Sequence, residues 1–157
     1  MSRATESLPW VVDTSVLLDI CSADPEFSKT SAACLAKYVS EGLVLSPISY
    51  VELAPAFLGR TALQEKFLAE VGVKWPTSWT LDDTRAAHGL WASHVEKQRT
   101  GHAGKRPVAD VIIEAFVKRF RGLITRNPRH FTTIQIVVPQ LQVQASDAGS
   151  PAPEGKG

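Results

Sequence analysis

The sequence predicts an α/β protein built around a parallel sheet. Two observations on the sequence and one general rule on strand connections support this prediction. Apolar runs of three or four residues alternate along the chain with longer segments of helical periodicity. Capping residues, glycines and prolines separate these segments at the expected places. Short strands separated by helices pair in parallel through crossover connections. The 157 residues are 44% hydrophobic and 21% charged, so one domain has enough apolar residues for a core and general disorder is excluded.

The first half of the chain holds two strands and three helices. Trp10-Val11-Val12 predicts a buried strand, and Thr14-Ser15 are expected to cap a helix that runs to residue 20. Ser28 is expected to cap a helix over 28–39. Leu43-Val44-Leu45 predicts the second strand. Ser46-Pro47 then begins a third helix, since proline suits the first helical position, and Pro55 kinks or splits it.

The second half continues the alternation. A short helix over 62–71 precedes an edge strand over 73–75. Thr80 with Asp83 resembles a capping box, which predicts a helix over 81–98. After a glycine-containing loop, Pro107 begins a helix through residue 120. Strands follow over 123–125 and 136–138. The tail over 145–157 is small, polar and proline-rich, so we expect one domain over 1–144 and a disordered C-terminal tail.

The cysteine count, the absence of long apolar segments and the distribution of charge limit the kinds of protein that this sequence can encode. Cys21 and Cys34 make neither a disulfide framework nor a zinc site, and buried free thiols are favoured over a redox role. No apolar segment is long enough to span a membrane and no signal peptide is visible, so a soluble cytoplasmic protein is expected. The net charge is +1, but residues 94–130 carry 9 Lys and Arg against 3 Asp and Glu. This segment indicates either a polyanion partner or an ordinary solvated surface.

Four polar side chains stand at the ends of predicted strands or early in the helices that follow. In a parallel sheet these junctions share one edge, so the side chains can converge there. A carboxylate among apolar neighbours is costly unless it is paired or binds a metal. A salt bridge for Glu52 and a capping role for Asp110 are the alternatives for each acid alone. The four residues are Asp13, Glu52, Asp110 and Asn127.

Metal binding explains the carboxylates together better than separate structural roles do. An all-oxygen ligand set, with no cysteine and no zinc-type histidine spacing, favours Mg²⁺ or Mn²⁺. His102 and His130 lie in basic loops, where they are candidates for phosphate contacts.

Several motifs resemble the PIN-domain family, in particular the VapC-type toxins of bacterial toxin–antitoxin pairs. The resemblance covers residues 10–139 and depends on the order and spacing of the motifs. They are Val11-Val12-Asp13-Thr14-Ser15, Ser49-Tyr50-Val51-Glu52-Leu53, Ala109-Asp110-Val111-Ile112-Ile113-Glu114-Ala115, and Leu123-Ile124-Thr125-Arg126-Asn127 with His130-Phe131.

The resemblance implies a three-layer α/β/α sandwich with a short central parallel sheet and a metal-dependent endoribonuclease activity. Asp13, Glu52 and Asp110 would be the metal ligands, and Asn127 falls where many relatives have a fourth acid, which leaves one or two metals open. The products would carry a 5′-phosphate and a 3′-hydroxyl. Side chains expected to orient ligands or waters, with helix capping as their alternative role, are Thr14, Ser15 and Thr125. Expected RNA-backbone contacts are Arg99, Lys105, Arg106, Arg126 and Arg129.

The resemblance also implies partners. A cognate antitoxin would cover the helices of residues 47–71 at apolar positions, for which a place in the core is the alternative, and a homodimer is implied as well. These positions are Phe57, Leu58, Leu63 and Phe67. Two other functions compete with the nuclease. A haloacid-dehalogenase-type phosphatase would need an acid where Ser15 stands. A non-catalytic RNA- or protein-binding module of the same fold is supported by Asn127.

Overall fold

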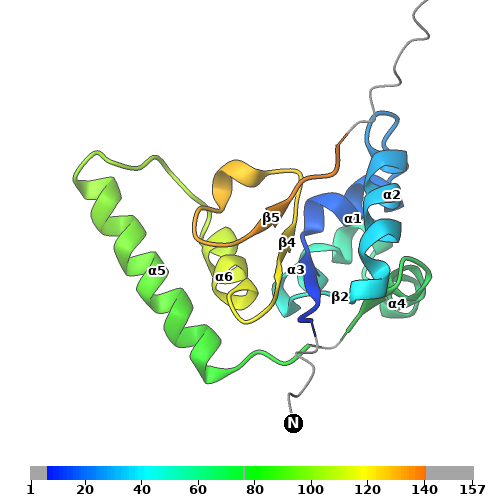
Figure 1. Cartoon of the computed structure of the whole chain (residues 1–157), viewed down its shortest axis with the longest axis horizontal. Helices are drawn as coiled ribbons and strands as arrows, with labels where there is room; N and C mark the ends of the chain where they lie inside the picture. Colours follow the sequence, from blue (N-terminus) through cyan, green and yellow to red (C-terminus); the bar gives the residue numbers. More distant parts are fainter. Residues whose placement is uncertain (1–6, 76, 141–157) are drawn as a thin grey trace, which may run out of the picture.

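A computed structural model describes residues 7–75 and 77–140. Five parallel strands form one sheet in the order β3-β2-β1-β4-β5 (Figure 1). The predicted parallel α/β fold is therefore confirmed, and all five predicted strands are present, with the third at an edge. The strands are β1 (Trp10–Val12), β2 (Leu43–Val44), β3 (Val73–Lys74), β4 (Gly122–Ile124) and β5 (Ile136–Val137).

Helices flank the sheet on both faces, which gives the α/β/α sandwich (Figure 1). Pro55 does split the third predicted helix, and the capping box of Thr80 and Asp83 is present. The α-helices are α1 (Thr14–Cys21), α2 (Ser28–Tyr38), α3 (Pro47–Glu52), α4 (Thr61–Glu70), α5 (Leu81–Arg99) and α6 (Val108–Val117). Short 3₁₀ turns are η1 (Val39–Glu41), η2 (Ala54–Phe57) and η3 (Pro128–His130).

The core is divided by the sheet because successive strand residues point to opposite faces. On β1, Trp10 and Val12 pack with the cluster that contains Leu17 of α1. Val11, between them, packs on the other face with Phe116 of α6. Burial on both faces explains why these strands are continuous apolar runs rather than alternating ones.

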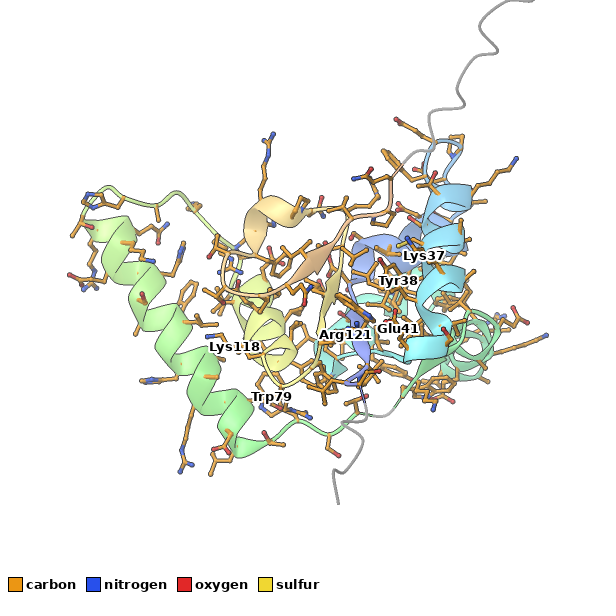
Figure 2. The ribbon with its side chains drawn as sticks, in the orientation of Figure 1. Lys37, Tyr38, Glu41, Trp79, Lys118 and Arg121 are labelled. Carbon is orange, nitrogen blue, oxygen red and sulfur yellow. The ribbon has the colours of Figure 1, made fainter. Side chains whose placement is uncertain are left out.

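Side chains from several segments pack over the edge of the sheet at which the strands begin. Arg121, just before β4, pairs with Glu41 and lies over the ring of Trp10. Tyr38 packs edge-on against the same ring, and Figure 2 labels Tyr38, Glu41 and Arg121 near one another. The opposite, carboxyl edge is where the polar candidate residues lie.

Two capping predictions are wrong. Asp13, rather than Thr14-Ser15, is the N-cap of α1, because its carboxylate accepts the backbone N–H of Thr14. Phe27 precedes α2, so Ser28 is the first helical residue and makes no cap.

Both cysteines are free and half-buried. The predicted tail lies outside the described residues. Among residues 7–75 and 77–140, no helix is long and apolar enough to cross a membrane.

Candidate metal centre

Asp13 is a buried carboxylate directly after β1, at the carboxyl edge of the sheet. Its Oδ1 accepts the backbone N–H of Thr14 at 2.9 Å. Its Oδ2 accepts the hydroxyls of Thr125 at 2.7 Å and Ser15 at 3.0 Å. These bonds hold the carboxylate in one orientation, with α1 on one side and the segment after β4 on the other.

Glu52 approaches from the C-terminal end of α3. The hydroxyl of Thr14 donates to its Oε1 at 2.9 Å, which links Glu52 to the residue beside Asp13. The apolar neighbours of Glu52 in the sequence do not turn it toward the core, since Val51 is 68% exposed and Glu52 is exposed as well. Ser49 and Leu53, one turn apart, form the buried face of this helix instead.

Asp110 lies in the first turn of α6 and is half-buried. Its Oδ2 is 2.7 Å from Nδ1 of His130 in η3. The sequence indicated His130 as a loop residue for phosphate contacts and as part of one of the family-like motifs. The structure places it beside a candidate metal ligand.

The three carboxylates act on one another electrostatically. Burial raises the pKa of Asp13 above its ordinary value, against the hydrogen bonds it accepts, and the charge of Asp110 raises it further. The pKa of Glu52 is also raised, first by removal of its carboxyl group from water and then by the charges of Asp13 and Asp110. Like charges gathered in this way favour a bound cation or a proton.

One observation on this site argues against a bound metal ion and two argue for it. Among the described residues, no three His, Cys, Asp or Glu side chains stand close enough to hold a metal ion as they are placed. The donor chemistry nevertheless suits a hard cation, since every ligand candidate is a carboxylate oxygen. Within the part of the chain that the structure describes, Oε2 of Glu52 and Oδ1 of Asp110 accept no hydrogen bond. Two oxygens are thus free for a cation.

Asn127 is exposed at the start of η3. Its backbone N–H donates to the Thr125 hydroxyl at 3.0 Å, and that hydroxyl donates onward to Asp13. The main chain of Asn127 therefore supports the orientation of Asp13, whereas no hydrogen bond of its side chain occurs within the described residues.

The five predicted RNA contacts fall into two groups. Arg126 is bound to the buried carboxylate of Asp19 and lies 4.0 Å from the ring centre of Phe27. Arg106 is bound to the buried carboxylate of Glu114 at 3.0 Å. The remaining three are exposed side chains for which no ion pair occurs within the described residues: Arg99, Lys105 and Arg129.

Three buried acids pair with arginines that the sequence did not predict, and they are Asp19, Asp83 and Glu114. Glu114 carried a usable signal, because a charge inside Val111-Ile112-Ile113-Glu114-Ala115-Phe116 must be compensated. Its partner Arg106 is eight residues earlier. Asp19 also sits in an apolar helix, but its partner Arg126 is 107 positions away, and no local pattern predicts that pairing.

Comparisons with known proteins give no identification. No protein-family model matches the sequence, and no curated protein matches it significantly.

Proposed function

We propose that this protein is a Mg²⁺- or Mn²⁺-dependent endoribonuclease of the PIN-domain, VapC type, and that it is the toxin of a toxin–antitoxin pair acting on cytoplasmic RNA. One observation carries the proposal. Asp13, Glu52 and Asp110, which are far apart in the sequence, gather at the carboxyl edge of a parallel sheet without an arginine or lysine partner within the described residues. That edge is where open α/β sheets bind their ligands.

The proposed reaction is hydrolysis of a phosphodiester bond. A bound Mg²⁺ or Mn²⁺ would supply a water with a lowered pKa and neutralise charge on the phosphoryl oxygens. Asp13, fixed by three hydrogen bonds, would hold the cation in a set position with Glu52 and Asp110. The oxygen of a water would bond to phosphorus and the water would give up a proton to solvent. The bond from phosphorus to the 3′ oxygen would break, and that oxygen would take up a proton from solvent, which leaves a 5′-phosphate and a 3′-hydroxyl.

RNA cleavage by purified protein tests the proposal. We expect cleavage with Mg²⁺ or Mn²⁺, none in EDTA, and a loss in Asp13→Asn. Asparagine can still cap α1, so this variant removes charge without removing the cap. Asp82→Asn is the matched control, because that carboxylate is 92% exposed. Cleavage that persists in EDTA and in Asp13→Asn would refute the proposal.

The proposed antitoxin partner would cover η2 and α4. Leu58 and Leu63 are 81% and 48% exposed there. Phe57 and Phe67 pack on each other with ring centres 5.4 Å apart and against the core, so they support this surface from beneath. We expect expression of the protein alone to arrest growth and a small co-encoded protein to relieve the arrest. Harmless expression of folded, metal-binding protein would count against the toxin role. A homodimer is part of the same proposal.

A non-catalytic RNA- or protein-binding module is the second candidate. It is favoured by the pairing of Asp110 with His130. It is also favoured because, among the described residues, no three potential ligand side chains stand close enough to hold a metal ion. Failure to cleave any RNA, together with no Mn²⁺ binding, would favour this candidate.

A further inference from the structure

A cavity of about 340 Å³ lies between the C-terminal half of α5, the loop over 101–107 and η3. Four lysine and arginine side chains and three histidines line it, against a single carboxylate, that of Glu114. Such an excess of positive charge around a concave surface favours an anionic ligand.

The single carboxylate does not neutralise this charge. Oε2 of Glu114 accepts Nη1 of Arg106 at 3.0 Å. Its Oε1 accepts the backbone N–H groups of Thr132 at 2.8 Å and Thr133 at 3.1 Å. Since Glu114 is committed to these partners, the positive charges of the remaining basic side chains stay uncompensated.

Two side chains that line the cavity, those of Arg106 and His94, have buried nitrogens without a hydrogen-bond partner in the described part of the chain. Nε and Nη2 of Arg106 are buried and have no hydrogen-bond partner among residues 7–75 and 77–140, and the same holds for Nε2 of His94. Nε and Nη2 form one edge of the guanidinium group, and this edge matches two oxygens of a phosphate. Buried donors are normally satisfied, so an acceptor from outside the chain is expected here.

The cavity is joined to the candidate metal centre by His130. This side chain lines the cavity, and its Nδ1 is 2.7 Å from Oδ2 of Asp110. A strand of nucleic acid with one phosphate at the carboxylates could therefore place a neighbouring phosphate in the cavity.

We propose that the cavity formed by Arg106, His94 and Lys97 binds a phosphate group of single-stranded RNA next to the bond that is cleaved. The inference rests on the proposed function for the nature of the polyanion. The cavity positions the strand, and the carboxylates carry out the chemistry.

RNA binding without cleavage tests this assignment. The affinity of a short, labelled single-stranded RNA is measured in EDTA by fluorescence anisotropy over a range of salt concentrations. We expect Lys97→Ala and His94→Ala each to raise Kd by about tenfold, since a hydrogen bond to a charged group is lost. For Lys97→Ala, the slope of log K against log salt should fall by about 0.7. Arg106 is not substituted, because its loss would leave the carboxylate of Glu114 buried without its charged partner.

Lys118→Ala is the matched control, because it removes the same charge from an exposed lysine. Lys118 is the C-cap of α6, at the end of that helix away from the loop over 101–107 (Figure 2). Its Kd should stay near that of the unchanged protein. Equal effects of Lys97→Ala and Lys118→Ala, with no effect of His94→Ala, would overturn the assignment.

Two further arms identify the source of the phosphate and separate this inference from the proposed function. RNAs with a 5′-phosphate and a 5′-hydroxyl are compared: equal affinity indicates an internal phosphodiester, and a preference for the 5′-phosphate that is lost in His94→Ala indicates a terminal group. Either result supports the cavity as a phosphate site when Kd also rises in Lys97→Ala and His94→Ala, and equal affinity without that rise overturns the assignment. Cleavage is scored separately with Mg²⁺. Binding that depends on the cavity without cleavage would refute only the nuclease, whereas cleavage without such dependence would refute only the phosphate site.

Discussion

Six acidic side chains of this protein form two groups that differ in their partners. Acids of the first group each pair with an arginine from a distant or neighbouring segment. Acids of the second group lie at the carboxyl edge of the sheet and pair with hydroxyls, backbone N–H groups or a histidine. The first group is Asp19, Asp83 and Glu114, and the second is Asp13, Glu52 and Asp110.

The pKa values show what the difference means. Burial raises the pKa of Asp83, but the hydrogen bonds from Arg119 and Thr80 outweigh it, so the pKa of this carboxyl lies below its ordinary value. The pKa of Asp13 is raised despite three hydrogen bonds, because burial and the charge of Asp110 prevail. An acid whose charged form is favoured by hydrogen bonds and an arginine partner stabilises the fold. An acid whose pKa is raised, so that its charged form is disfavoured, is a candidate for a functional role.

Glu52→Gln should produce the largest effect, and it should affect activity alone. We expect RNA cleavage to fall by more than about a hundredfold, since even residues that only support metal ligands cost about 10–100-fold when they are lost. The thermal midpoint should stay unchanged because Glu52 is exposed and an amide oxygen can still accept the Thr14 hydroxyl. Cleavage at the original rate would show that Glu52 is not needed for metal-dependent cleavage.

Glu114→Ala should affect stability instead. The side chain of Glu114 is 1% exposed, and its removal leaves the guanidinium of Arg106 buried without its partner. We expect the free energy of unfolding to fall by about 3 kcal/mol, the usual scale for a broken buried pair. Urea denaturation measures this change. A loss under about 1 kcal/mol would show that the pair is not a stabilising element of the core.

Asp83 predicts a specific dependence of stability on pH. Because its folded-state pKa lies below the ordinary value of 3.8, its contribution is fully present above pH 3.8 and is lost as the pH falls through the lower, folded value. Urea midpoints measured from pH 7 to pH 3 should therefore fall less steeply at the acid end in Asp83→Asn than in the unchanged protein. Parallel curves would contradict the assigned role of the pair with Arg119.

Asp82→Asn should have the smallest effect. Asp82 is next to Asp83 in the chain, but its side chain is 92% exposed and its bond to Arg85 is 3.4 Å long. The free energy of unfolding should change by less than about 0.5 kcal/mol, because exposed ion pairs contribute little. A larger loss in urea denaturation would show that exposure does not separate the two neighbouring acids.

The sequence could predict most of the fold because its signals are local. Strand 10–12 is a continuous apolar run, and Thr80 with Asp83 marks the start of α5 within four residues. Capping at α1 was misassigned because Asp13 and Thr14 are both good caps, and only the backbone geometry shows that Asp13 makes the bond.

The candidate site could be predicted only in part. The expected sheet topology predicts that Asp13, Glu52 and Asp110 lie at one edge, and their role as metal ligands stays a prediction. Their immediate partners could not be predicted, because Thr125 reaches Asp13 across 112 positions and the pairing of His130 with Asp110 depends on the path of η3. The assignment of Arg126 to RNA overlooked Asp19 for the same reason.

Isothermal titration calorimetry of Mn²⁺ into the purified protein measures whether the acids at the carboxyl edge bind a metal. We expect saturable binding to the unchanged protein and to Asp83→Asn. Binding should be lost in Asp13→Asn and strongly weakened in Asp110→Asn, with all variants folded by circular dichroism. No binding to the unchanged protein, or equal binding to Asp13→Asn, would contradict the claim that the acids at the carboxyl edge form a metal site.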